Sequence, residues 1–135
     1  MEAAVAVSWW AIIIAAIVKF AIGAVWYQPL FGKRYRALMG VPEGASPDGL
    51  GAAIAVQLVG DLIMAYILAR FVAHYGTGIA DGAIVGFMAW LGFVATIMIG
   101  SIFYEKKPTE LVAINLGYQL IGIVAMGAII GWWQG

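Results

Sequence analysis

Four long apolar stretches dominate this chain, and each is long enough to cross a lipid bilayer. A membrane-spanning helix needs about 20 predominantly apolar residues. The four stretches lie at approximately Ala3–Tyr27, Leu50–Ala73, Ile79–Tyr104 and Thr109–Trp133. We predict helices, because lipid cannot satisfy the backbone of open strands and the alternation of a β-barrel is absent. The sequence therefore predicts an all-α integral membrane protein with one domain over residues 1–135.

The composition agrees with a membrane protein and argues against several classes of function. Apolar residues make up 64% of the chain and charged residues only 10%, whereas soluble proteins have about 25% charged residues. The net charge is zero, so the protein as a whole exerts no electrostatic attraction on nucleic acid. There is no cysteine and one histidine, His74, and no paired carboxylates stand at acid–base spacing. We therefore expect no enzyme activity, cofactor, metal or nucleic-acid partner.

The basic residues predict how the chain is oriented. Four spans place both termini on one side of the membrane, and that side carries only Arg70. The two connections on the other side carry five basic residues: Lys33, Arg34, Arg36, Lys106 and Lys107. Basic loops stay in the cytoplasm. We therefore expect a multi-pass protein of the inner cell membrane with both termini outside the cytoplasm.

The first connection begins with a segment that is both basic and apolar. Leu30, Phe31, Tyr35 and Met39 fall near helical spacing within Pro29–Met39. This pattern predicts a short interfacial helix on the anionic inner leaflet. The alternative is a partly ordered loop that carries ordinary cytoplasmic charges.

The two halves of the chain resemble each other. Ala21–Gln28 aligns with Met98–Glu105, and Ile54–Ile63 aligns with Val112–Ile121. Both copies would start outside, run inward and return, so we predict two parallel-repeat helical hairpins about an axis along the membrane normal. The alternative is coincidence between apolar helices of similar composition.

Polar residues recur at similar depths within the spans. There are six of them: Lys19, Gln57, Asp61, Thr96, Asn115 and Gln119. From the helical rise, Lys19 and Asp61 lie roughly 12 and 15 Å deep. An unpaired charge at such depth costs about 2.5–3.5 kcal/mol, so we expect these two residues to pair. The layer has two interpretations, an ion or proton site and a structural pin that fixes helix register.

Glycines recur at helix-packing spacing along the third stretch. Gly82 and Gly86 form one small-residue motif, and Gly92, Thr96 and Gly100 form a second. Small residues let helix backbones approach closely in lipid. The motifs predict either packing within the chain or a face for self-association or for a partner.

Several motifs resemble a known family. The run Gly23–Lys33 (GAVWYQPLFGK) resembles the signature that follows the first span of the bacterial membrane family known as domain of unknown function seventeen-sixty-one. The segments Trp90–Thr96 and Ile114–Tyr118 are similar to its third and fourth spans. The resemblance implies a four-helix membrane protein and brings no assigned activity.

Two functional hypotheses follow. The first is a small non-enzymatic membrane protein that works by helix–helix association, either as a homo-oligomer or as an accessory subunit of a larger membrane complex. The second is an ion- or proton-coupled transporter or channel that uses the polar layer. A water-connected cavity beside Lys19 and Asp61 would favour transport. A dry, closed bundle with lipid-facing glycines would favour association.

Overall fold

The computed structural model describes residues 7–40 and 50–135, and these residues form an almost entirely helical protein. No strand occurs among them. Four helical segments are long and apolar enough to cross a membrane: Trp9–Leu30, Leu50–Tyr75, Ile79–Tyr104 and Thr109–Gln134. The predicted all-α fold with four spans is confirmed.

Two of the four spans contain a wide π-helical turn. The first span consists of α1 (Trp9–Val25) and the π-helical segment η1 (Trp26–Leu30), and the short helix α2 (Gly32–Met39) follows it. The second span is α3 (Leu50–Tyr75). The third consists of α4 (Ile79–Ala89), the π-helical segment η2 (Trp90–Ala95) and α5 (Thr96–Tyr104). The fourth is α6 (Thr109–Gln134).

The first span starts later than the sequence predicted. Helix α1 begins at Trp9, where the Ser8 side chain accepts a hydrogen bond from the Ala11 amide at 3.2 Å. A serine in this position satisfies an amide that the first helical turn leaves free. Val7 and Ser8 are not helical, and residues 3–6 of the predicted span lie outside the described residues.

The same span continues past Tyr27, where the sequence predicted its end. Proline lacks an amide and normally breaks an α-helix. Here Pro29 lies within η1, and across this wider turn the Phe31 amide donates to the Trp26 carbonyl at 2.9 Å. The prediction that the short helix begins at Pro29 is therefore wrong, because Pro29 lies within the last turn of the first span and α2 begins at Gly32.

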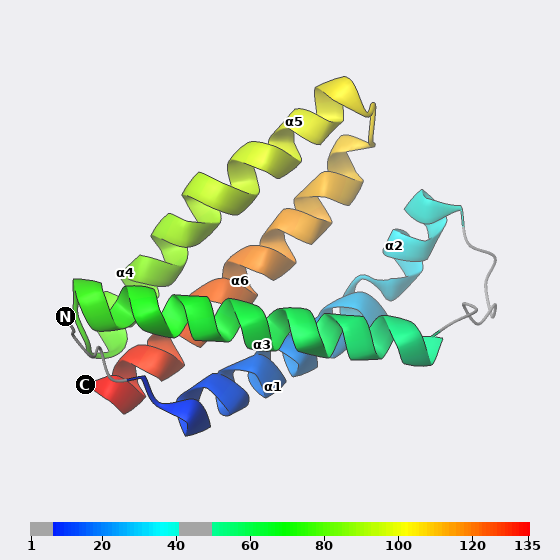
Figure 1. The fold of residues 1–135 in the computed structure, drawn as a ribbon. Helices are drawn as coiled ribbons and strands as arrows, with labels where there is room; N and C mark the ends of the chain where they lie inside the picture. The colour runs from blue at the N-terminus through cyan, green and yellow to red at the C-terminus, as the bar shows by residue number, and fades with distance from the viewer. Residues whose placement is uncertain (1–6, 41–49) are drawn as a thin grey trace.

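Helix α6 is the centre of the bundle. It contacts α1, α3, α4 and α5, and it buries ten of its residues. Figure 1 shows α6 running beside the third span, and the most extensive contact between helices is that of α6 with α4. A Cβ atom added to Gly82 would lie 2.0 Å from the Gly127 carbonyl oxygen. Because no side chain fits there, these glycines set the distance between the two helices.

Helix α3 is packed over only part of its length. Its buried residues are Asp61, Ala65, Leu68, Ala69 and Val72, and none lies before Asp61. Figure 1 shows α3 crossing the other helices, with its Leu50 end away from the third span. The first three turns therefore have little cover from the rest of the described chain.

The ends of the helices sort into two groups (Figure 1). The start of α1 and the C-terminus lie at one end, whereas α2 and the turn between α5 and α6 lie at the other. This is the arrangement of two helical hairpins. The π-helical segments do not support the internal repeat, because the predicted alignment would pair η1 with residues 103–107 rather than with η2. The repeat itself stays a prediction.

Candidate functional site

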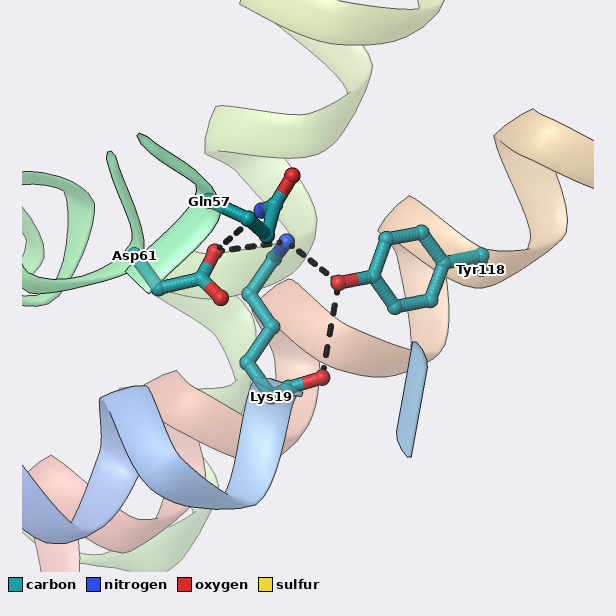
Figure 2. A network of polar contacts seen from close by, with 4 residues as sticks. All are labelled: Lys19, Gln57, Asp61 and Tyr118. Carbon is teal, nitrogen blue, oxygen red and sulfur yellow. Dashed lines mark hydrogen bonds and ion pairs between the residues drawn. The ribbon is translucent and has the colours of Figure 1, made fainter. Parts of the chain in front are cut away.

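A buried ion pair joins α1 to α3. The Lys19 Nζ atom lies 3.2 Å from Asp61 Oδ1, and the exposed fractions of the two side chains are 0% and 1%. Gln57, one helical turn before Asp61, donates from Nε2 to the same oxygen at 2.9 Å. Figure 2 shows the three side chains converging from two helices. The sequence placed these residues in one polar layer, and the structure brings them together.

A tyrosine from α6, which was not predicted from the sequence, completes the network. The Tyr118 hydroxyl accepts from Lys19 Nζ at 3.0 Å and donates to the Lys19 carbonyl at 3.4 Å (Figure 2). The ammonium also lies 4.4 Å from the centre of the Tyr118 ring, where a cation is attracted by the π-electrons. The sequence feature that could have identified Tyr118 is its position deep inside an apolar span, because tyrosines in membrane proteins are enriched at the membrane interface.

Small residues make room for the network. A Cβ atom at Gly122 would lie 3.1 Å from the Lys19 side chain, and one at Gly23 would lie 3.1 Å from the Tyr118 hydroxyl. Ala16 and Ala65, on the two helices that carry the ion pair, are also fully packed. The lysine side chain is therefore closely packed and has no contact with solvent or lipid.

A second polar contact lies nearer the α2 end of the bundle. The Tyr27 hydroxyl donates to Asn115 Oδ1 at 2.5 Å, and the Trp26 indole donates to the Ile114 carbonyl at 3.0 Å. The rings of Tyr27 and Tyr118 meet edge to face at 5.3 Å, which connects this contact to the ion pair. Asn115 is thus bonded to an aromatic residue of η1 rather than to the ion pair.

The two other predicted members of the layer are not bonded to the ion pair. The Gln119 Oε1 atom is buried and has no hydrogen-bond partner among the described residues. Thr96 is exposed, and its hydroxyl donates to the Gly92 carbonyl of its own helix at 2.9 Å. The expectation that Thr96 faces the polar layer is wrong. The wide turn of η2 immediately precedes Thr96 and changes the direction in which the following side chains point.

The four glycines of the third span fall into two groups. Gly82 and Gly86 pack against the backbone of α6, with added Cβ atoms 2.0 and 2.6 Å from its carbonyl oxygens. Gly92 and Gly100 would meet nothing within 4 Å. The first pair therefore serves packing within the chain, and only the second pair is open to another molecule.

The five basic residues at the α2 end are exposed, and two of them form ion pairs. Arg34 pairs with Glu110 of α6, and Lys107 pairs with Glu105 at 3.3 Å. The hydrogen bond to Glu110 raises the pKa of Arg34 above its ordinary value. Lys33, Arg36 and Lys106 form no ion pair with a described residue. Arg34 thus contacts α6 through an exposed ion pair, while Lys33, Arg36 and Lys106 can face an anionic surface.

The side chains of the network are of types that bind ions and exchange protons. Lysine, aspartate and tyrosine can each carry or release a proton. No water-sized space touches Lys19, however, since its exposed fraction is zero. Asp61 Oδ2 is buried without a hydrogen-bond partner among the described residues, so one acceptor of the carboxylate is unused.

The fold and the buried network together define a small multi-pass membrane protein with four spanning helices and an internal ion pair. Residues 10–131 match the family described as Protein of unknown function (DUF1761), so the chain belongs to this family. This confirms the resemblance drawn from the sequence motifs. No curated protein and no solved structure matches the chain.

Proposed function

We propose that this protein works by helix–helix association within the membrane, as a homo-oligomer or as an accessory subunit, and catalyses no reaction. The observation that carries the proposal is the contrast between its interior and its surface. The Lys19–Asp61 pair is closed and fully buried, as a pin that fixes helix register would be. Glycines that usually mediate helix contacts, Gly92 and Gly100, are open on the outside of the bundle.

The partly packed α3 supports the same proposal. In lipid, helices associate through close backbone approach and interhelical hydrogen bonds rather than through hydrophobic burial. The exposed part of α3 offers both, because it contains Gly51 and Gly60 with open Cβ positions and the amide of Gln57.

The mass of the particle in lipid nanodiscs or native-membrane particles tests the proposal. We expect the wild-type protein to be larger than a monomer, and Gly92→Leu with Gly100→Leu to reduce its mass. Ala113→Leu is the matched control, since it adds a bulky residue to an exposed position of α6. Two results together would contradict the proposal. The wild-type protein would be monomeric at every lipid ratio, and a photo-crosslinker at Gly100 would form no cross-link to any protein in cells.

An ion- or proton-coupled transporter is the second candidate. It is favoured by two buried acceptor atoms, Asp61 Oδ2 and Gln119 Oε1, that have no hydrogen-bond partner among the described residues. Buried groups of this kind can take up a proton or a cation. If the protein is a transporter, proteoliposomes that contain it must show proton or cation flux. Asp61→Asn should abolish this flux, whereas Glu110→Gln, which changes an exposed carboxylate, should leave it unchanged.

We propose that the protein lies in the inner cell membrane with both termini outside the cytoplasm. The five exposed basic residues at the α2 end support this orientation, because basic loops stay inside. The chain has no cysteine, so single introduced cysteines can be labelled cleanly. A membrane-impermeant thiol reagent added to intact cells should label Gly135→Cys and spare Lys107→Cys. The reverse pattern would overturn the orientation.

A further inference from the structure

The first three turns of α3 differ from every other part of the four spans. Ten of the eleven residues from Leu50 to Gly60 are exposed, and Leu58 is half-buried. The exposed residues lie on all sides of the helix rather than on one lipid-facing stripe. These turns are apolar and belong to a span, so they lie in the membrane with little cover from the described chain.

One polar side chain lies in the middle of this stretch. The Gln57 amide uses Nε2 to donate to Asp61 Oδ1 at 2.9 Å. Its oxygen points away from Asp61 and Lys19 (Figure 2), and no described residue donates to it. The hydrocarbon region has no water to bond this oxygen or the second amide hydrogen. The amide therefore has one acceptor and one donor available to another molecule.

The residues beside Gln57 are small. Ala53 and Gly60 stand four residues before and three residues after Gln57, so they lie next to it on the helix surface. Both are exposed, and a Cβ atom at Gly60 would meet nothing within 4 Å. A second helix can therefore approach the backbone of α3 on this side closely enough to reach the amide.

We propose that the occupant of this surface is a second copy of the chain, docked through its own α3. The proposal rests on the proposed function in its homo-oligomeric form. The positive-inside rule gives all copies the same orientation, so the two α3 helices are parallel and residues of equal depth meet. A carboxamide is self-complementary, since it can donate and accept at once. Gln57 of each copy donates to and accepts from Gln57 of the other across a twofold axis.

Cysteine cross-linking in native membranes tests the surface. Ala53→Cys and Gly60→Cys should each form a covalent dimer on mild oxidation, because they flank the twofold contact. Val59→Cys should not, although it is exposed at the same depth, since it lies on the opposite side of α3. Cross-linking at Val59 that equals cross-linking at Ala53 and Gly60 would overturn the proposal.

Substitution of the amide tests its role. We expect Gln57→Leu to weaken dimerisation by about 10- to 1,000-fold, the range of the two interhelical hydrogen bonds that the dimer loses, and Gln57→Asn to restore part of it. Unfolding of both variants as detergent monomers controls for the lost bond to Asp61. Particles that are dimeric by mass but form no cross-link at Ala53 or Gly60 would overturn this interface and leave the proposed association standing. Monomers at every lipid ratio would overturn the interface and homo-oligomerisation together.

Discussion

Replacing Asp61 with asparagine is expected to destabilise the protein by about 3–5 kcal/mol, the cost of removing one partner from a buried ion pair. The change leaves the Lys19 ammonium fully buried without an opposite charge, among neutral partners such as the Tyr118 hydroxyl and ring. The measurement is the free energy of unfolding in mixed micelles. Glu110→Gln is the control, because it breaks an exposed ion pair with Arg34 and should change stability little.

The stability of a double variant tests whether Lys19 and Asp61 act as one coupled pair or contribute independent contacts. Lys19→Met with Asp61→Asn removes both charges, and methionine can follow the path of the lysine past Gly122. Buried ion pairs replaced by apolar residues of similar volume are often neutral in stability. The double variant should therefore be more stable than Asp61→Asn alone, with a coupling energy of at least about 1 kcal/mol. Additive effects of the two changes would show that Lys19 and Asp61 do not share one environment.

The four spans could be predicted from hydropathy, because a long apolar segment in a bilayer must satisfy its backbone hydrogen bonds internally and therefore forms a helix. The ends of the last three spans agree with the sequence to within two residues, since turn residues or charges bound them. The inner end of the first span did not follow, because Pro29 usually terminates a helix. A π-helical turn accommodates it here, and nothing in composition or spacing identified that turn.

The core of the polar network was predictable because two opposite charges at similar depth in one small bundle must find each other. Lys19 and Asp61 met this condition, and they pair. Thr96 and Asn115 were placed by depth and by the alignment of the two halves, and neither fixes where a side chain points relative to the other helices. The turn of η2 precedes Thr96, and the aromatic residues of η1 bind the Asn115 side chain and its neighbour's carbonyl.

The roles of the glycines were not predictable from spacing. Gly82 and Gly86 stand four residues apart, and Gly92 and Gly100 stand eight apart, so each pair falls on one helical face. Both patterns suit a helix contact equally well. Only the three-dimensional structure separates the pair that faces α6 from the pair that faces outward.

Replacing Gly82 with alanine is expected to destabilise the protein by about 1–3 kcal/mol, as overpacking of a close contact does. The new methyl group would lie 2.0 Å from the Gly127 carbonyl oxygen and 3.0 Å from the Gly131 Cα atom. Both obstacles are backbone atoms, so no side-chain rotation relieves the clash and α4 must move away from α6. The free energy of unfolding of detergent monomers measures this cost without a contribution from assembly.

The same substitution at Gly100 should act in the opposite direction. A Cβ atom there meets nothing within 4 Å, and alanine is favoured over glycine in a helix by about 0.5–1 kcal/mol. Gly100→Ala should therefore be neutral or stabilising, while Gly82→Ala in the same span is destabilising. Equal effects at the two positions would contradict the close α4–α6 contact. A destabilising change at Gly82 beside a neutral or stabilising one at Gly100 would show that Gly82 packs tightly within the bundle and that Gly100 does not.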